Sequence, residues 1–196
     1  MRVRIEEQPI DHSADHASLS TAFIANSRID LTKLESSCPA LPLATLPLVP
    51  PAYKNYDTYP GNSPTAWPQR LDVSAWGLLA AFIDDARIGG VVLAHRTFGL
   101  ELLNDSEDRA LVWDLRVAPD ARRHGIGVQL LSAARAWACS RGCSVLLVET
   151  QDINVPACHL YAATGYCIAR IDRNAYPDCP GEASLIWQRA LSAPAT

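Results

Sequence analysis

The chain lacks the long apolar segments that membrane-spanning and exported proteins need. Its first residues, MRVRIEEQPIDHS, contain no apolar stretch of the kind that signal peptides carry, so we expect no signal peptide there. The longest uninterrupted apolar run in a predicted element, Leu78 to Ile83, is far shorter than the roughly 20 residues that cross a bilayer. These absences predict a cytoplasmic protein without a membrane partner.

The sequence also lacks the cysteine and histidine spacing of a metal site. Its six cysteines include no Cys-x-x-Cys pair and no histidine cluster completes a zinc site, so we expect no metal. In a cytoplasm these thiols are expected to stay reduced, most of them packed as small apolar side chains. The six are Cys38, Cys139, Cys143, Cys158, Cys167 and Cys179.

Strong positive charge is absent as well. The net charge is −4, and no basic cluster is larger than Arg122-Arg123-His124, which argues against general nucleic-acid binding. An acidic chain instead suits a cationic partner.

The sequence does contain enough apolar material for one folded domain. With 196 residues, 48% hydrophobic and 19% charged, it has the composition of a globular protein, and we expect a single domain over residues 1–196. Residues 30–70, which are rich in proline and tyrosine, are expected to form the variable part that shapes a substrate pocket. Residues 192–196 are expected to be a loose tail.

Periodicity predicts an α/β chain. The predicted strands are Arg2–Glu7, Trp76–Ile83, Ala86–Thr97, Leu111–Val117, Ser144–Thr150, Tyr166–Asp172 and Ala183–Leu191. Two helices are predicted, at about residues 127–140 and between Asn154 and Gly165.

Other segments have weaker patterns. Gly89-Gly90 suggests a bulge or bend inside a strand. Asp11–Ser18 is polar and turn-like, and Tyr53–Pro68 has the composition of a loop. Leu19–Leu31 fits either an uneven helix or an extended segment ending at Asp30, whereas the prolines of Leu41–Pro51 favour extended structure.

The stretch from Leu111 to Leu131 organises the functional interpretation. A strand ends at Val117, and the loop that follows contains Arg122-Arg123-His124-Gly125-Ile126-Gly127 before the first long helix. A glycine-bearing loop at a helix N-terminus presents free N–H groups and the positive end of the helix dipole, which together bind an anion such as a phosphate.

Two familiar phosphate loops do not fit this stretch. No lysine follows Gly127, which excludes a P-loop, and Leu130 stands where a dinucleotide fingerprint needs its third glycine. The remaining pattern, Arg-x-x-Gly-x-Gly after a strand, resembles the acetyl-CoA diphosphate loop of the GNAT superfamily of N-acetyltransferases. A later segment also matches the superfamily pattern Asn-x-x-Ala-x-x-Leu-Tyr-x-x-x-Gly-Phe/Tyr, with Asn154, Ala157, Leu160, Tyr161, Gly165 and Tyr166.

This resemblance implies a fold and a cosubstrate. The implied fold is a mixed, mostly antiparallel twisted sheet of six to seven strands, flanked by helices and splayed between the fourth and fifth strands. Residues 110–191 would be the acetyl-CoA-binding and catalytic half. The implied acetyl-CoA contacts are Leu115, Arg116, Val117, Arg122, Arg123, His124, Gly125, Ile126, Gly127, Val128, Asn154 and Tyr161.

Within the superfamily the chain is most similar to the streptothricin acetyltransferases. The similarity covers Glu149-Thr-Gln-x-x-Asn154-Val-Pro-Ala-Cys158-x-Leu-Tyr161, the later Ile171-Asp172 and Tyr176, and Pro51-Ala-Tyr53-Lys54-Asn-Tyr56. It implies transfer of an acetyl group to a primary amine of a small cationic acceptor, such as a streptothricin-like antibiotic, and hence antibiotic resistance. Acetylation of a protein lysine or N-terminus, and an acetyl-CoA-binding regulatory module without turnover, stay open as alternatives. A homodimer is one alternative for the assembly.

The transfer requires a base and an acid. An amine with a pKa near that of lysine is mostly protonated at neutral pH, so a carboxylate must take its proton. Asp114 and Glu149 are the candidates, although each also fits a structural or strand-end carboxylate, and Trp113-Asp114 replaces the Glu-Asp that the relatives often carry. Tyr161 is the candidate acid for the departing thiolate, with a core position as its other reading.

Overall fold

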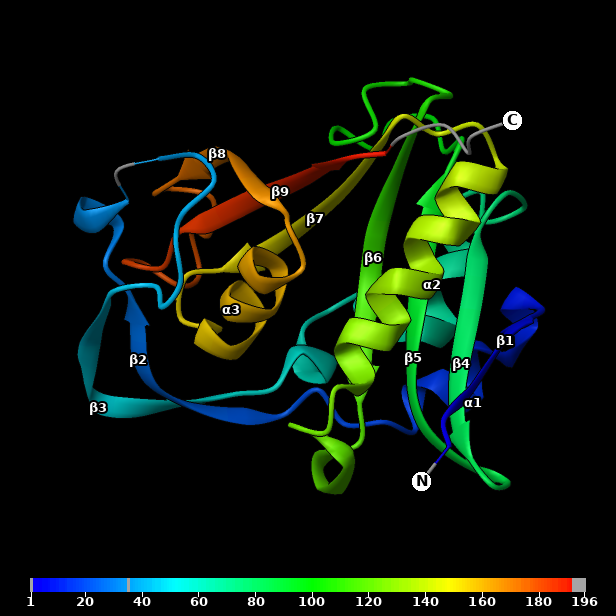
Figure 1. The fold of residues 1–196 in the computed structure, drawn as a ribbon, viewed down its shortest axis with the longest axis horizontal. Coiled ribbons are helices and arrows are strands. Elements are labelled where there is room, and N and C mark those ends of the chain that lie inside the picture. Colours follow the sequence, from blue (N-terminus) through cyan, green and yellow to red (C-terminus); the bar gives the residue numbers. More distant parts are fainter. Residues whose placement is uncertain (1, 35, 192–196) are drawn as a thin grey trace. The chain divides into compact units, whose positions relative to one another are not determined.

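The computed structural model describes residues 2–34 and 36–191, so the tail predicted at 192–196 lies outside the described part. Seven strands form a sheet in the order β1-β4-β5-β6-β7-β9-β8, and β2 and β3 form a separate ribbon (Figure 1). The pairs β1–β4, β2–β3, β4–β5, β5–β6 and β8–β9 are antiparallel. The predicted mixed, mostly antiparallel α/β fold with helices beside the sheet is therefore confirmed.

The described residues fall into two compact units. Unit one comprises the described parts of 1–22, 55–146 and 190–196, and unit two comprises 23–54 and 147–189. Each unit is described by itself below. The expectation of one domain over residues 1–196 stays a prediction.

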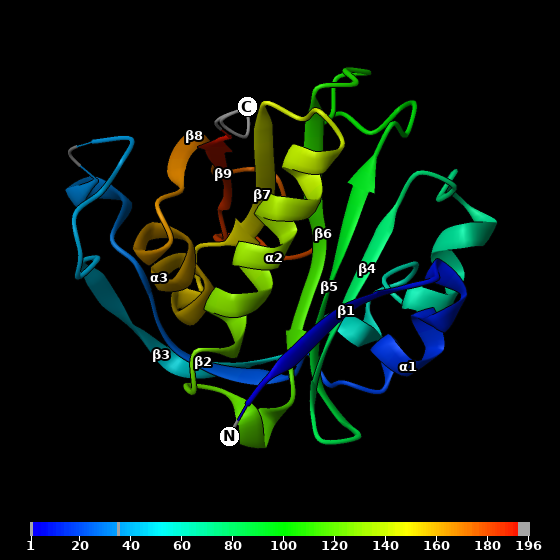
Figure 2. The same cartoon turned by 45° about the vertical axis from the view of Figure 1, so that its right-hand side comes forward.

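Unit one contains four antiparallel strands and a long helix. The strands are β1 (Arg4–Gln8), β4 (Gly77–Ile83), β5 (Ala86–His95) and β6 (Arg109–Val117). The helices are the short α1 (Ser13–Ala17) and the long α2 (Ile126–Ser140), which extends along β4, β5 and β6 (Figure 2).

Two adjacent glycines let helices approach opposite faces of β5. A Cβ added to Gly89 would lie 3.1 Å from Leu130 of α2, and one added to Gly90 would lie 2.6 Å from the His16 ring of α1. Consecutive strand residues point to opposite faces, so each glycine makes room for one helix. The register between β4 and β5 also shifts beside Gly89, which confirms the irregularity predicted there.

A β-bulge in β6 sets which side chains share a face. Val92 pairs with Asp114 but Leu93 pairs with Val112, so Trp113 is the extra residue. Beyond it, Asp114 and Arg116 share the α1 face while Leu115 lies on the opposite face, as the alternation predicts.

Unit two contains three strands of the sheet, the ribbon and one helix. The strands are β7 (Val145–Gln151, which begins in unit one), β8 (Cys167–Asp172) and β9 (Ser184–Ala190), with the ribbon strands β2 (Phe23–Ile29) and β3 (Thr45–Lys54). Helix α3 (Val155–Ala163) begins at Asn154, whose side chain accepts from the Ala157 amide, and Gly165 follows it at a φ of 78°. The predicted cap and stop of this helix are therefore confirmed.

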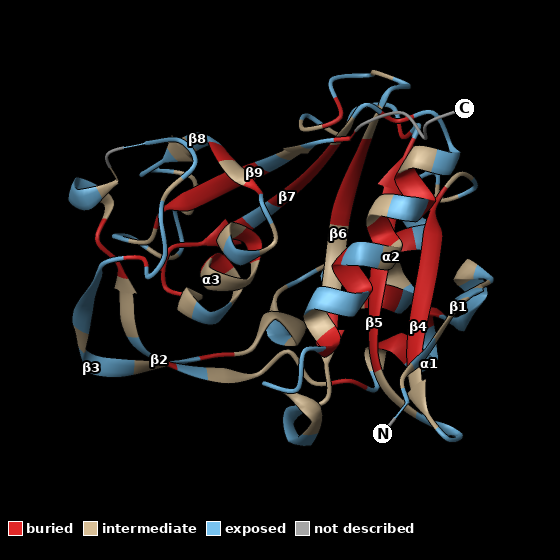
Figure 3. Ribbon diagram, viewed as in Figure 1, coloured by how far each residue is buried: buried red, intermediate tan, exposed pale blue. Residues whose placement is uncertain are grey.

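Burial follows the apolar patterns. In unit one the buried residues lie mainly on β4, β5, β6 and the sheet-facing side of α2, while the outer side of α2 is exposed (Figure 3). In unit two the Tyr161 ring lies 5.8 Å from Tyr166 and 6.1 Å from Trp187, measured between centroids. Both units thus have an apolar core of their own.

Several weaker expectations are corrected or decided. Asp11–Ser18 is not only a turn, because it contains α1, whose His16 is fully buried. Of the two alternatives for Leu19–Leu31, the extended one is right, since β2 ends at Ile29. Tyr53–Pro68 includes the end of β3 and short 3₁₀ turns at Tyr56–Thr58 and Pro64–Gln69, so it is more ordered than a plain loop.

The expectation that all six thiols are reduced is wrong. Cys38 and Cys167 form a disulfide, while Cys139, Cys143, Cys158 and Cys179 remain thiols. The pairing joins residues 129 positions apart, so sequence spacing could not reveal it. Separately, no helix in residues 2–34 and 36–191 has the length and apolar character needed to cross a membrane.

Candidate functional site

The glycine loop of unit one has the backbone geometry of an anion site. Gly125 is the N-cap of α2 at a φ of 78°, a left-handed conformation that glycine adopts without strain. No side chain caps the helix there. The first amides of a helix have no acceptor within the helix, so those of Ile126, Gly127 and Val128 lack an intrahelical partner.

The loop is open at the position where a diphosphate would lie. A Cβ added to Gly125 would meet nothing within 4 Å, and both Arg123 and His124 are exposed beside it. Free amides, a helix N-terminus and nearby cationic side chains suit a diphosphate group. The residues present therefore fit the diphosphate of acetyl-CoA.

The Arg122 side chain, a predicted acetyl-CoA contact, makes several contacts within the protein. Its guanidinium donates to three backbone carbonyls, those of Val117 (3.0 Å), Ala22 (2.9 Å) and Ser20 (2.9 Å). The side chain thus ties the loop to the end of β6 and to the segment after α1. It orders the loop, and the exposed Arg123 is the arginine that remains available to a ligand.

The other arginine assigned to cofactor binding, Arg116, is a buried ion-pair centre. Its guanidinium donates to Asp114 (2.8 and 3.0 Å) and to the Leu19 carbonyl (3.0 Å), and it pairs with Asp57 at 2.7 Å. Burial alone would lower the pKa of Arg116, but the two carboxylates raise it. Only the backbone of Arg116 is left for the predicted cofactor contact.

Asp114 is held in the same network. Its Oδ1 also lies 2.8 Å from Nε2 of the buried His16. Burial acts to raise the pKa of Asp114, yet the hydrogen bonds and charges of His16 and Arg116 outweigh it and lower the pKa. A carboxylate stabilised in its charged form by a buried arginine is a poor proton acceptor, so this geometry favours the structural reading of Asp114.

Glu149 has the opposite electrostatics. On β7 of unit two, its Oε1 accepts from the Tyr176 hydroxyl and from Ser184 Oγ at 2.8 Å. The Glu149 side chain is exposed overall, but neighbouring groups partly desolvate its carboxyl, which raises the pKa of Glu149 above its usual value, and the two hydroxyls oppose that rise. A carboxylate with a raised pKa, held by neutral donors and not by a cation, has the properties of a general base.

Tyr161 and Asn154 occupy the positions that the motif predicts on α3. Tyr161 is buried, with its ring among Tyr166 and Trp187, so packing fixes its orientation. Asn154 Oδ1 accepts from the Ala157 amide at 3.3 Å, which confirms its capping role. Their contacts to a cofactor stay predictions.

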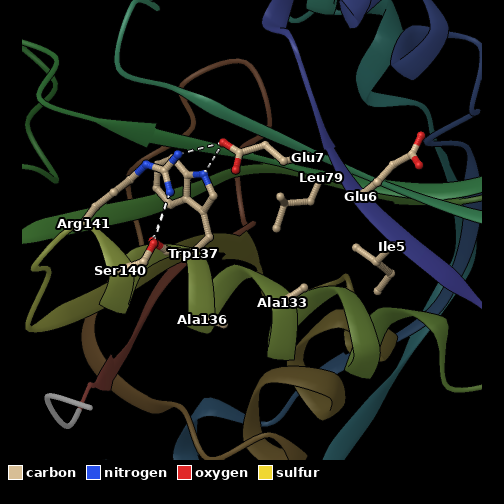
Figure 4. A pocket seen from close by; sticks show the side chains of 9 residues that line it. All are labelled: Ile5, Glu6, Glu7, Leu79, Ala133, Ala136, Trp137, Ser140 and Arg141. Carbon is tan, nitrogen blue, oxygen red and sulfur yellow. Dashed lines mark hydrogen bonds and ion pairs between the residues drawn. The ribbon is translucent and has the colours of Figure 1, made fainter. Parts of the chain in front are cut away.

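A pocket of about 300 Å³ lies away from all of these residues. It lies in unit one against β1 and the second half of α2, where Glu7 accepts from Trp137 Nε1 (2.8 Å) and from Arg141 (2.7 Å) (Figure 4). None of the predicted site residues lines it. The predicted chemistry thus points to the Gly125 loop and Glu149 and not to this pocket.

Sequence reasoning missed the partners of these groups. His16, Asp57 and Ser184 were not among the predicted site residues, because each meets its partner only through the fold. Tyr176 was quoted in the resemblance to the streptothricin enzymes, and the structure places its hydroxyl on Glu149. The resemblance to the streptothricin enzymes was therefore the sequence signal for the group formed by Glu149, Tyr176 and Ser184.

Solved structures define the class to which this fold belongs. The fold resembles that of a putative streptothricin acetyltransferase from Bacillus anthracis strain Ames, solved in complex with acetyl coenzyme A, with a TM-score of 0.72. The match covers 98% of this chain and 100% of that one at 22% identity, which shows the fold alone. The chain therefore shares its fold with that protein.

The sequence itself defines the family. The pattern of the Acetyltransferase (GNAT) family matches residues 48–166, more than half of the chain. The chain belongs to this family.

Two curated relatives are similar over part of the chain. Streptothricin acetyltransferase A of Bacillus subtilis (strain 168) is 40% identical over 80 residues, which are 40% of this chain and 46% of that protein. A streptothricin acetyltransferase of Escherichia coli is 33% identical over 110 residues, 55% of this chain and 58% of that protein. The chain thus spans about half the length of these curated relatives.

Proposed function

We propose that this protein is an acetyl-CoA-dependent N-acetyltransferase that acts on a primary amine of a small cationic acceptor, with a streptothricin-like antibiotic as the leading candidate. The proposal is supported by family membership and by the curated relatives named for streptothricin acetylation. The observation that carries it is the open, left-handed Gly125 cradle at the start of α2.

Unit one would hold the cosubstrate. The amides of Ile126, Gly127 and Val128 and the side chain of Arg123 bind the diphosphate, and Arg122 keeps the loop in the binding conformation through its three carbonyl contacts. Acetyl-CoA supplies the activated acetyl group as a thioester. Holding donor and acceptor in reacting geometry converts a bimolecular step into an intramolecular one.

Glu149 would take the proton from the acceptor ammonium. Its raised pKa brings its affinity for a proton closer to that needed at neutral pH, and its carboxylate also attracts a cationic acceptor. Tyr176 and Ser184 hold the carboxylate in one orientation. Asp114 is the weaker candidate, because Arg116 and His16 already engage it.

Tyr161 would supply the proton that the departing thiolate needs. A phenol has a pKa near 10, so it is protonated at neutral pH and can donate as negative charge develops on sulfur. Packing of the Tyr161 ring against Tyr166 and Trp187 fixes the position of its hydroxyl relative to α3.

A thiol-release assay tests the proposal. The protein is incubated with acetyl-CoA and a panel of acceptors: streptothricin, aminoglycosides, polyamines, a lysine peptide and a peptide with a free N-terminus. Release of CoA with streptothricin or another small polycation is the expected result. Release only with peptides would favour protein acetylation, and tight acetyl-CoA binding without release would favour a regulatory module.

A further inference from the structure

The segment that carries Tyr176 has no regular structure of its own. Residues 173–183 join β8 to β9 and contain neither helix nor strand. Yet the Tyr176 hydroxyl donates to Glu149, so the segment must be fixed by contacts with neighbouring elements. These contacts come from the ribbon of unit two.

Lys54, at the end of β3, makes two contacts with this segment. Its Nζ lies 2.8 Å from Glu182 Oε1 and donates to Cys179 Sγ at 3.5 Å. The Lys54 side chain is only 7% exposed, and a buried ammonium requires polar partners. The sequence contains one other lysine, the exposed Lys33, so this burial is specific to Lys54.

The contacts of Lys54 lie close to Tyr176 along the chain. The Cys179 amide donates to the Tyr176 carbonyl at 3.0 Å, and the Glu182 amide donates to the Cys179 carbonyl at 3.1 Å. These two turns connect the residues that Lys54 holds with the tyrosine that reaches Glu149. A displacement at Cys179 and Glu182 would therefore be passed to Tyr176.

Arg28 of β2 anchors the same segment further along. It donates to the Gly181 carbonyl and, through Nε at 2.9 Å, to the buried Asp152. Asp152 Oδ1 in turn accepts from the Ala183 amide at 2.9 Å. The end of the segment thus keeps its place without Lys54, so loss of Lys54 should affect the Tyr176 side most.

We propose that Lys54 is a positioning residue for acetyl transfer: by holding Cys179 and Glu182, it keeps the Tyr176 hydroxyl on the carboxylate of Glu149. The inference rests on the proposed function, in which Glu149 accepts the proton of the acceptor amine. Lys54 itself touches no reacting atom.

The proposal predicts a change in the proton affinity of Glu149. The groups that interact with this carboxyl are Tyr176 from the segment and Ser184 from β9, and the charge of Glu149 also acts on the Cys158 thiol of α3. Partial desolvation raises the pKa of Glu149, and Tyr176 and Ser184 lower it by donating to the charged form. Releasing Tyr176 removes one of these two donors, so the pKa rises further.

The test compares Lys54→Met, Lys54→Arg and the control Lys33→Met. The pKa of Glu149 is measured without acetyl-CoA by carbon-13 NMR of labelled glutamate, with the signal assigned through Glu149→Gln. Lys54→Met should raise the pKa, Lys54→Arg should restore most of the original value, and Lys33→Met should leave it unchanged. Tyr176→Phe should raise the pKa with Lys54 intact, and adding Lys54→Met to it should change little.

The pH profile of kcat/KM separates this inference from the proposed function. For each unit by which the pKa rises, kcat/KM at pH values below it should fall about tenfold, because the charged fraction falls tenfold. A raised pKa without a shift in the acidic limb would leave the positioning role standing and refute Glu149 as the base. An unchanged pKa in folded Lys54→Met would overturn the positioning role. If Lys54→Met does not fold, Glu182→Gln provides the same comparison from the other partner.

Discussion

Replacing Gly125 by alanine should separate the backbone cost of this position from its role in binding. At a φ of 78° a residue with a Cβ is strained, and the left-handed conformation costs about 1–2 kcal/mol. The added Cβ meets nothing within 4 Å, so no clash adds to that cost in the free protein. For a protein of this size the melting temperature should fall by about 2–8 °C.

Gly142 provides the matched control at the other end of α2. Its φ is 76°, and a Cβ added there also meets nothing within 4 Å. Gly142→Ala should therefore show a similar loss of stability, measured by denaturant unfolding. Only Gly125→Ala should weaken acetyl-CoA binding, since its methyl group occupies the space of the diphosphate.

Isothermal titration of acetyl-CoA measures the difference. We expect the Kd of Gly125→Ala to rise at least about tenfold, which corresponds to roughly 1.4 kcal/mol, while Gly142→Ala keeps the original Kd. Gly125→Val should abolish detectable binding. Equal affinities for the Gly125→Ala and Gly142→Ala variants would refute the assignment of the loop as the diphosphate site.

Three further changes test the proton-transfer groups. Tyr161→Phe keeps the ring packing and should lower kcat by about 10²–10⁴ with acetyl-CoA affinity unchanged; equal losses in both would contradict the acid role. Glu149→Gln should abolish most activity but become more stable relative to the original protein as pH rises. The pKa of Glu149 is raised in the folded state, so ionising Glu149 destabilises the folded original protein; this cost is absent at acid pH and fully present above the folded pKa. Unfolding curves measured across pH test this, and a stability difference that does not change with pH would contradict it. Asp114→Asn should destabilise the protein at neutral pH, and the difference in stability should shrink as pH falls through the lowered pKa of Asp114. If Asp114→Asn instead removed the acidic limb of the kcat/KM profile without loss of stability, Asp114 would be the base.

Local signals in the sequence predicted most of the regular structure. Helix α3 carries its own start and stop in Asn154 and Gly165, and these alone place its ends. The Gly125 loop was predictable for the same reason, because a glycine motif between a strand and a helix encodes its geometry in consecutive residues. The geometry of the Gly125 loop is thus a local feature.

Contacts between residues far apart in the chain limit what can be predicted from the sequence. Arg122 is a predicted acetyl-CoA contact, and the loop motif gives no sign of its carbonyl partners at Ser20 and Ala22, about a hundred positions away. In the same way α1 is only five residues long. It is held by contacts from distant residues, because Asp114 accepts from His16 and Gly90 leaves room for the His16 ring. No periodicity in the sequence marks such pairs, so whether a charged residue is catalytic or structural could be judged only from the fold.

The cross-link between Cys38 and Cys167 has a consequence for the unfolded chain. It closes a loop of 129 residues, and in the chain-entropy account a loop of that length raises folding stability by about 5 kcal/mol. A typical domain is stable by only about 5–15 kcal/mol, so a large share of the total depends on whether this bond is intact. The same polypeptide should therefore melt at well-separated temperatures in oxidising and reducing buffers, and its lifetime in a cell would follow the redox state of its surroundings.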